Sequence, residues 1–259
     1  MIVDAHAHLG PWPRFGVTDK SVEAYLSVMD HLGIGVAVVS HHAALCGLLQ
    51  DGAELSRAAY EQSGGRILSF LVYDPNRPDE SLRIIEADAS RTHVVGIKVH
   101  PTLHLCSADD ARYRPAWEAA RKWGLVVMAH SWDRAVDHPA QGLSFPDLYE
   151  SYLRAYPEVR FIFGHGGGRY NGFISCARLV AQFPNAYLDI SGDGFMMGRL
   201  EYLVSQVGSK KILYGSDAPW FDPRLGIGEV LAADVTDEDR DNILGRNATS
   251  LFGLAEEGA

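Results

Sequence analysis

Short apolar runs alternate with segments of helical periodicity along the whole chain. Strand-like runs occur near residues 2–5, 35–40, 66–73, 94–99, 125–129, 159–163, 186–190 and 211–214. The segments between them, such as 111–123 and 173–183, carry apolar side chains every three or four residues, as helices do. Strands that are apolar throughout are typical of parallel sheets covered on both faces. The pattern therefore predicts a (β/α)8 TIM barrel that forms a single domain over residues 1–259.

A doubly wound open sheet is the alternative arrangement for alternating strands and helices. That fold binds dinucleotides through a Gly-x-Gly-x-x-Gly turn after its first strand. Here the first strand runs into His6-Ala7-His8, and the glycine run 166–168 comes late and lacks the spacing. The absence of this turn favours the barrel.

Histidine or aspartate side chains lie at the carboxyl ends of four predicted strands. His6 and His8 end the first strand, His130 the fifth, His165 the sixth and Asp217 the eighth. Because the carboxyl ends of a barrel's strands lie at one rim, we expect these side chains to converge. A lone histidine is more often a core residue than a ligand, and a single His-x-His pair is weak evidence. The repetition at four strand ends is what favours a shared site.

A metal centre is the chemistry that this set of residues predicts. His6 and His8 are two residues apart, so strand alternation places both imidazoles on one face. A catalytic ion takes about three or four protein ligands and keeps one position open, and His130 and Asp217 can complete the set. We expect one divalent ion, with zinc as the first choice and manganese as the alternative. Such an ion lowers the pKa of its bound water to about 7.

His165 and Asp217 are the predicted catalytic residues. We expect His165 to act as a general acid or base, or to polarise a carbonyl. In the alternative, His165 is itself a ligand and His130 lies outside the coordination shell. Asp217 is expected to accept a proton from water as well as to bind the ion. Its alternative role is the N-cap of the helix that follows.

The predicted rim also offers residues for substrate binding. Lys98 and His100 end the fourth strand and share one face, and a buried lysine needs an anion or a modification. We expect Lys98 to bind a substrate carboxylate or, as a carbamate, to bridge a second metal. The alternative is a salt bridge to Asp4 or to another acid at the rim. The further substrate-binding candidates are two loop cations and two aromatic side chains, Arg14, Arg169, Trp132 and Trp220.

Composition restricts the classes of partner. The formal net charge of −10 argues against nucleic acid and anionic membranes, and no apolar run reaches the length of a membrane span. Cys46, Cys106 and Cys176 are widely spaced and odd in number, which suits a reducing compartment. We therefore expect a cytoplasmic protein with a small-molecule substrate. A homodimer is the default assembly for such a barrel.

Five segments resemble the amidohydrolase superfamily. They are Asp4-Ala5-His6-Ala7-His8, Gly96-Ile97-Lys98-Val99-His100-Pro101, Val127-Met128-Ala129-His130, Gly164-His165-Gly166-Gly167 and Tyr214-Gly215-Ser216-Asp217-Ala218-Pro219. More narrowly, they are similar to the branch that contains aminocarboxymuconate-semialdehyde decarboxylase and γ-resorcylate decarboxylase, and the similarity runs to Asn247-Ala248. It implies a (β/α)8 barrel with one divalent ion, usually zinc. The ligands that it implies are His6, His8, His130 and Asp217.

The resemblance also implies that His165 is the catalytic histidine. Lys98 stands at the strand where dinuclear relatives carry a carboxylated lysine. The decarboxylases of this branch tend to be longer than this compact chain. We therefore expect first a metal-dependent hydrolase of a small amide, lactone or ester, which uses metal-activated water. The alternatives are a non-oxidative decarboxylase or hydratase of a small unsaturated or aromatic acid, and a barrel that only binds a ligand.

Overall fold

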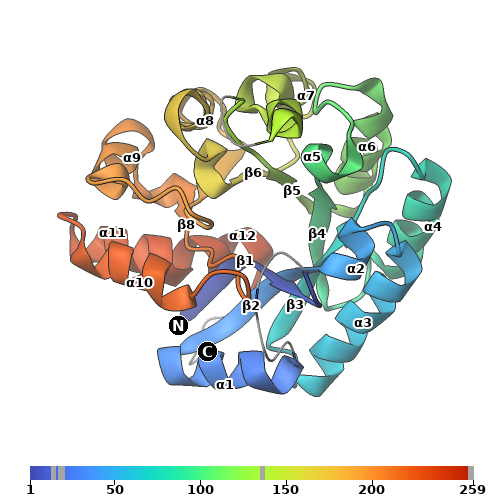
Figure 1. Ribbon diagram of the computed structural model, residues 1–259, viewed down its shortest axis with the longest axis horizontal. Helices are drawn as coiled ribbons and strands as arrows, with labels where there is room; N and C mark the ends of the chain where they lie inside the picture. The colour runs from blue at the N-terminus through green and yellow to red at the C-terminus, as the bar shows by residue number, and fades with distance from the viewer. Residues whose placement is uncertain (13–15, 17–20, 135–137, 256–259) are drawn as a thin grey trace.

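In the computed structural model, eight parallel strands form a barrel within the described residues, and helices surround it (Figure 1). The structure describes residues 1–12, 16, 21–134 and 138–255. The strands are Ile2–Leu9 (β1), Ile34–His41 (β2), Ile67–Val72 (β3), Val94–Val99 (β4), Val126–His130 (β5), Phe161–Gly164 (β6), Ala186–Asp189 (β7) and Ile212–Leu213 (β8). The predicted (β/α)8 barrel is confirmed.

The helices follow the strands in regular alternation. The α-helices are Val22–Leu32 (α1), His42–Leu45 (α2), Leu49–Gln62 (α3), Pro78–Asp88 (α4), Pro101–His104 (α5), Arg114–Trp123 (α6), Glu150–Ala155 (α7), Tyr170–Gln182 (α8), Arg199–Val207 (α9), Pro223–Ala232 (α10), Asp237–Asp241 (α11) and Asn247–Phe252 (α12). The other helical turns are Ala111–Tyr113 (η1), Pro139–Ser144 (η2), Pro146–Tyr149 (η3), His165–Gly167 (η4), Ser209–Lys211 (η5) and Asn242–Arg246 (η6). Over the described ranges, no helix combines the length and apolarity that a membrane span requires.

Each strand pairs with its successor in the sequence, from β1 to β8. The barrel closes between the first and last strands through backbone hydrogen bonds. Ala5 N donates to Tyr214 O at 2.9 Å, and Asp217 N donates to His6 O at 2.8 Å. The second bond places the backbone of a residue after β8 directly against the His-x-His segment of β1.

An irregularity in β1 determines where His6 points. The register of β1 against β2 shifts between Asp4 and Ala7. The Asp4 side chain accepts a hydrogen bond from Tyr25 of α1, so it faces the outer helices. With strict alternation His6 would follow Asp4 outward, whereas its ring lies with His165 at the rim. A bulge of this kind re-aims the side chains that follow it.

The barrel interior below the rim is packed with apolar side chains. One buried cluster draws members from six strands and from α12: Val3, Ala5, Val38, Leu68, Phe70, Val126, Met128, Ile162, Leu213, Ala248 and Leu251. Residues from strands on all sides of the barrel can meet only in its centre, so this cluster fills the interior. The polar side chains at the carboxyl ends therefore stand on a closely packed floor.

Candidate metal and active site

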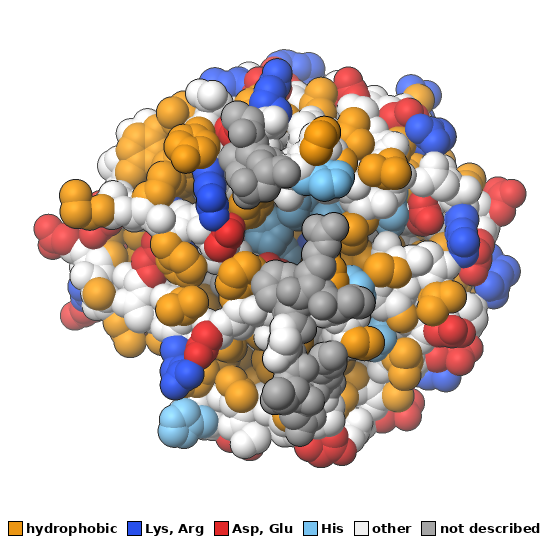
Figure 2. Space-filling view, viewed as in Figure 1, with side chains coloured by type: hydrophobic (Ala, Val, Ile, Leu, Met, Phe, Trp, Pro, Cys, Tyr) orange, Lys and Arg blue, Asp and Glu red, His pale blue; other side chains and the backbone are white. Residues whose placement is uncertain are grey.

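A cavity of about 460 Å³ opens at the carboxyl ends of the strands. Figure 2 shows pale blue histidine side chains in the hollow at the centre of this face. The lining residues are His6, His8, Trp12, Lys98, His100, Thr102, Leu103, Leu105, His130, Trp132, His138, Gln141, His165, Gly192, Asp193, Asp217, Trp220 and Phe221. A second cavity, of about 680 Å³, lies between α1 and the segment after β8, and His6, Lys98, His165 and Asp217 are not among its lining residues. The candidate metal-binding and catalytic residues therefore lie in the cavity at the rim.

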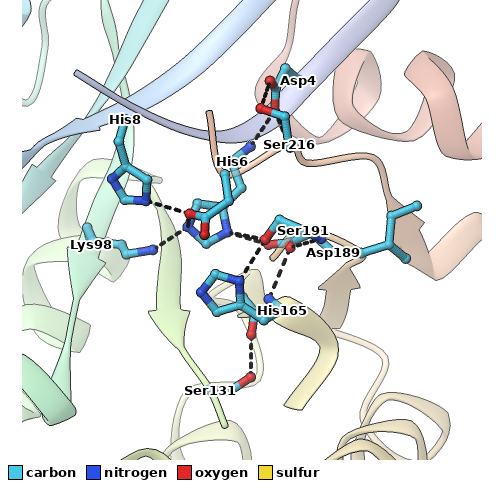
Figure 3. Close-up of polar contacts among 12 residues, drawn as sticks. Asp4, His6, His8, Lys98, Ser131, His165, Asp189, Ser191 and Ser216 are labelled. Atoms are coloured by element: carbon cyan, nitrogen blue, oxygen red, sulfur yellow. Dashed lines mark hydrogen bonds and ion pairs between the residues drawn. The ribbon is translucent and has the colours of Figure 1, made fainter. Parts of the chain in front are cut away.

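His6 is held at both of its ring nitrogens. Its Nδ1 lies 2.9 Å from Asp189 Oδ2, and its Nε2 lies 2.8 Å from the Lys98 ammonium (Figure 3). Because a carboxylate only accepts hydrogen bonds, the proton lies on Nδ1 and the lone pair on Nε2. This is the tautomer in which an imidazole offers Nε2 to a cation.

His8 and Asp217 face each other across an unusual contact. His8 Nδ1 lies 3.0 Å from the Ser40 carbonyl oxygen and must donate its proton to it. In neutral His8 the other nitrogen, Nε2, is then an acceptor, and it lies 3.0 Å from Asp217 Oδ1. That oxygen is buried and has no hydrogen bond of good geometry among the described residues. Two acceptors that face each other in a buried site are stabilised by a cation between or beside them.

This contact tests whether the residues fit a metal ion. His6 Nε2, His8 Nε2 and Asp217 Oδ1 are all lone-pair donors, and the His6 nitrogen is 4.0 Å from the Asp217 oxygen. Nitrogen and carboxylate donors of this kind suit zinc and manganese. The donor set therefore fits a divalent ion. Lys98, which donates to the same lone pair of His6, would have to give up that hydrogen bond on metal binding.

The charges around the site favour ionised carboxylates. Burial alone would raise the pKa of Asp217, but the imidazoles of His165, His8 and His6 hold it below its usual value. Lys98 is 1% exposed, and burial lowers its pKa to about 8, although Asp189 and Asp217 raise it. At neutral pH the lysine is therefore mostly an ammonium ion, and it is balanced by two carboxylates.

His165 follows β6 in a left-handed backbone conformation, with φ of 62°. Its backbone N–H donates to Asp189 Oδ1 at 3.0 Å, and its Nδ1 lies 2.9 Å from Ser191 Oγ. Burial lowers the pKa of its ring to about 3, against the opposing effect of Asp217. The ring is therefore neutral at pH 7, and it lines the cavity.

His130 is turned toward a residue of η2. Its Nε2 lies 2.9 Å from Gln141 Oε1, which also accepts a hydrogen bond from Thr102 Oγ1 at 3.1 Å. The ring stacks on His100, with centroids 4.1 Å apart. Since Nε2 is occupied by Gln141, Nδ1 is the nitrogen of His130 that remains for a cation.

The structure brings most of the predicted metal ligands to one place. Among the described residues, the ligand atoms of His6, His165 and Asp217 lie within 4.8 Å of one another. His8 joins this group through its contact with Asp217, while His130 stands beside it and contacts His165 edge to face. Distance alone thus does not decide between His130 and His165 as a ligand. The predicted ligand set and the two catalytic roles stay predictions.

The predicted substrate-binding residues divide into two groups. Lys98, His100, Trp132 and Trp220 line the cavity. Arg169 is not among the lining residues and is bound to Asp193, with 2.6 Å between Nη2 and Oδ2. Arg14 lies outside the described residues. The alternative salt bridge from Lys98 to Asp4 is not found, since Lys98 contacts His6 and Asp4 accepts hydrogen bonds from Tyr25 and Ser216. The acids that stabilise the charge of Lys98 are instead Asp189 and Asp217 at the rim.

Three polar residues of the site were missed at the level of the sequence. Asp189 ends β7 and so follows the same rule as the residues that were selected, which could have identified it. Ser191 lies in the loop after β7 and Gln141 in the turn η2 after β5, and no local signal distinguishes them from other polar residues of such connections. Their importance comes only from the imidazole rings that they contact.

The barrel and its rim of histidines and carboxylates define a metal-binding enzyme class, and comparison with known proteins agrees. The amidohydrolase family model matches residues 3–254, so the chain belongs to the amidohydrolase family and is an enzyme of that superfamily. One curated relative is the 2-amino-3-carboxymuconate-6-semialdehyde decarboxylase of Dictyostelium discoideum. It is 24% identical over 191 residues, which is 61% of this chain and 53% of the relative. The match thus spans about half the length of that relative.

Solved structures share the fold over nearly the whole chain. One is the 5-carboxyvanillate decarboxylase of Novosphingobium aromaticivorans in complex with manganese and 4-hydroxy-3-methoxy-5-nitrobenzoic acid, with a TM-score of 0.75 and 14% identity. The alignment covers 98% of this chain and 96% of that one. Another is a putative 2-pyrone-4,6-dicarboxylic acid hydrolase of Pseudomonas putida, with a TM-score of 0.72, 18% identity and coverage of 99% and 98%. At these identities the likeness shows the fold alone.

Proposed function

We propose that the protein is a metal-dependent, non-oxidative decarboxylase of a small unsaturated or aromatic carboxylic acid. One observation carries the proposal: the buried ammonium group of Lys98 lies at the base of the rim cavity, beside His6 and the unsatisfied oxygen of Asp217. The cavity walls above it include the aromatic side chains of Trp12, Trp132, Trp220 and Phe221. A buried cation below flat apolar walls suits a planar anion.

The comparisons support this reading better than the hydrolase that was expected first. The curated relative is named as a decarboxylase, and so is one of the two neighbouring structures described above. The compactness of the chain, which favoured hydrolysis, carries less weight because the barrel aligns with nearly the whole of that decarboxylase.

His6, His8 and Asp217 would hold the metal ion, with Nδ1 of His130 as the fourth donor. Manganese occurs in the similar decarboxylase structure, while zinc suits the imidazole-rich donor set, so both ions are candidates. When bound, the ion would supply Lewis-acid polarisation of a substrate oxygen and would help to orient the substrate.

The protein's own residues account for the proton that the reaction needs. Decarboxylation breaks the bond between the carboxyl carbon and its neighbour, leaves the electron pair on that neighbour and consumes one proton as CO₂ departs. Lys98 would bind the anion and orient it. His165 would hold the proton at Nε2 and deliver it to the carbon, and a bound anion beside this ring would raise its pKa. The aromatic walls would exclude water from the carbanion-like centre.

The test is a product analysis on the metal-loaded protein. We expect a panel of aromatic and unsaturated acids to include one that releases CO₂ and, in D₂O, gains one deuterium at the vacated carbon. In ¹⁸O-labelled water the organic product should gain no label. The His165→Asn variant is the control for background reaction. If the panel yields no CO₂ while a lactone, ester or amide is opened with ¹⁸O incorporation, the enzyme is a hydrolase and the proposal fails.

A further inference from the structure

The hydroxyl group of Ser191 lies between two imidazole rings of the site. Its Oγ is 3.0 Å from His6 Nδ1 and 2.9 Å from His165 Nδ1. Asp189 lies on the same side, with Oδ2 at 2.9 Å from His6 Nδ1. Figure 3 shows both rings directed toward this pair of polar residues. Ser191 thus contacts the Nδ1 atoms of two histidines that are expected to play different roles, and Asp189 contacts the Nδ1 atom of His6.

The proton on His6 is fixed by Asp189. Oδ1 of this carboxylate accepts the backbone N–H groups of His165 and Ser191, at 3.0 and 2.9 Å, while Oδ2 faces His6. A carboxylate that accepts from donors on every side has no proton to give. The proton in the contact between Asp189 and His6 is therefore on His6 Nδ1.

The proton of the Ser191 hydroxyl is directed by geometry to His165. Since His6 Nδ1 is itself a donor, the Ser191 hydroxyl cannot donate to it. The Asp189 carboxylate also lies near Oγ, but it already accepts from His6 and from two backbone N–H groups. Of the two ring nitrogens within hydrogen-bond geometry of Oγ, His165 Nδ1 is the one that can accept, at 2.9 Å. A neutral imidazole that accepts at Nδ1 carries its proton at Nε2.

We infer that Ser191, oriented by Asp189, is a positioning residue that holds His165 in the Nε2–H tautomer while His6 is held in the Nδ1–H tautomer. The bare Nε2 of His6 faces the metal position. The Nε2–H of His165 faces the cavity as a proton donor and cannot bind a cation. The inference deepens the proposed function and rests on it for the use to which this proton is put.

The backbone around Ser191 is shaped for these contacts. Gly192 has φ of +81°, and a Cβ atom there would come within 2.9 Å of His165 Nδ1. A Cβ atom on Gly215 would lie 3.2 Å from Ser191 Cβ and 3.4 Å from Asp189 Cγ. Side chains at these two positions would crowd the same group of atoms. The close approach of the serine to both rings therefore depends on glycine at two separate places.

The tautomers can be measured directly by NMR. The full-length protein is labelled with ¹⁵N-histidine, and long-range ¹H–¹⁵N correlations distinguish a protonated ring nitrogen from a bare one. The spectra are recorded without metal and with zinc, and His165→Asn identifies the signals of His165. We expect a protonated Nε2 on His165 in both states. We expect His6 to be protonated at Nδ1 and to change its Nε2 shift when zinc binds.

A matched pair of serine variants tests the role of Ser191. Ser191→Ala removes the hydroxyl donor, so the Nδ1–H form of His165 should become populated. Ser131→Ala is the control, because Ser131 is equally buried and binds Gly164 O and Gly167 N in the adjacent loop but contacts no imidazole nitrogen in these bonds. It should leave the tautomer of His165 unchanged. With an identified substrate, Ser191→Ala should lower kcat about 10- to 100-fold with little change in KM.

The outcomes separate this inference from the proposed function. A bare Nε2 on wild-type His165, with or without zinc, overturns the inference, as does a Ser191→Ala protein that keeps the wild-type tautomer. If Ser191→Ala does not fold, the wild-type spectra decide alone. The expected tautomers without any decarboxylation would leave the inference standing and overturn the proposed function. Decarboxylation by a protein whose His165 Nε2 carries no proton would support the proposed function and overturn the inference.

Discussion

The indole ring of Trp220 stacks on the imidazole ring of His8, with centroids 4.0 Å apart and 18° between the planes. The hydrogen bond to the Ser40 carbonyl fixes one edge of His8, and the indole fixes its face. Trp220→Ala should therefore loosen the ring and lower zinc affinity about tenfold, while Trp220→Phe should preserve most of it. Competition with a chromophoric chelator measures both. Equal affinities in the wild type and the alanine variant would contradict this role of Trp220.

Removal of a single ligand should empty the metal site. His6→Ala and Asp217→Ala each delete one of the lone-pair donors that converge at the rim, and the loss of one ligand weakens the binding of the ion strongly. We expect elemental analysis of the purified variants to find most of the metal gone. Asp193→Ala is a suitable control, because Asp193 lines the cavity but is paired with Arg169. Full occupancy in both ligand variants would refute the assignment.

His165 should separate metal binding from turnover. His165→Asn removes the ring that the proposed mechanism uses for proton transfer, but it leaves His6, His8 and Asp217 in place. We expect unchanged metal content and a kcat lower by about 10²- to 10⁴-fold, the usual contribution of a general acid or base. Loss of metal in this variant would instead make His165 a ligand. An unchanged kcat would reduce it to a structural residue.

The buried ion pair between Arg199 of α9 and Glu229 of α10 should matter for stability. Nε of Arg199 lies 2.9 Å from Oε1 of Glu229, and the arginine side chain is 2% exposed. Arg199→Met leaves a poorly solvated carboxylate without its partner, which costs about 3–5 kcal/mol of unfolding free energy. The exposed pair of Arg154 and Glu150 offers a control, since Arg154→Met should cost less than about 1 kcal/mol. Urea denaturation distinguishes the two, and equal losses would contradict the prediction.

His41 should contribute to acid destabilisation. Burial and the neighbouring His42 lower the pKa of His41 to about 4, and its Nδ1 accepts the Ala43 N–H at the start of α2. His41 binds a proton near pH 6.5 in the unfolded chain but only near pH 4 in the folded one. Its contribution to the free energy of unfolding is therefore complete above pH 6.5. It falls by about 1.4 kcal/mol per pH unit as the pH drops from 6.5 to 4.

The control for this pH effect keeps the helix cap. His41→Asn retains a side-chain acceptor for the start of α2 and removes the titrating group. The unfolding free energy of His41→Asn should depend less steeply on pH between 6.5 and 4 than that of the wild type. Parallel curves for the two proteins would show that His41 does not titrate as described.

The local pattern of the chain was sufficient for the barrel and for the candidate residues. Apolar strands that alternate with helices are typical of a parallel sheet covered on both faces, and such a sheet closed into a barrel places every carboxyl end at one rim. The positions of His6, His165 and Asp217 follow from this rule. The bulge in β1 does not, because it depends on how β1 pairs with β2 and packs on α1.

Tertiary structure alone decided which nitrogen of each histidine is free. Asp189 and Ser191 lie more than 180 residues from His6 in the chain, yet they contact its ring, and Gln141 turns His130 in a similar way. Tertiary structure also decided that Arg169 pairs with Asp193. Periodicity records which face of an element is buried. Hydrogen bonds between loops depend on the shape of the rim, which residue spacing along the chain does not specify.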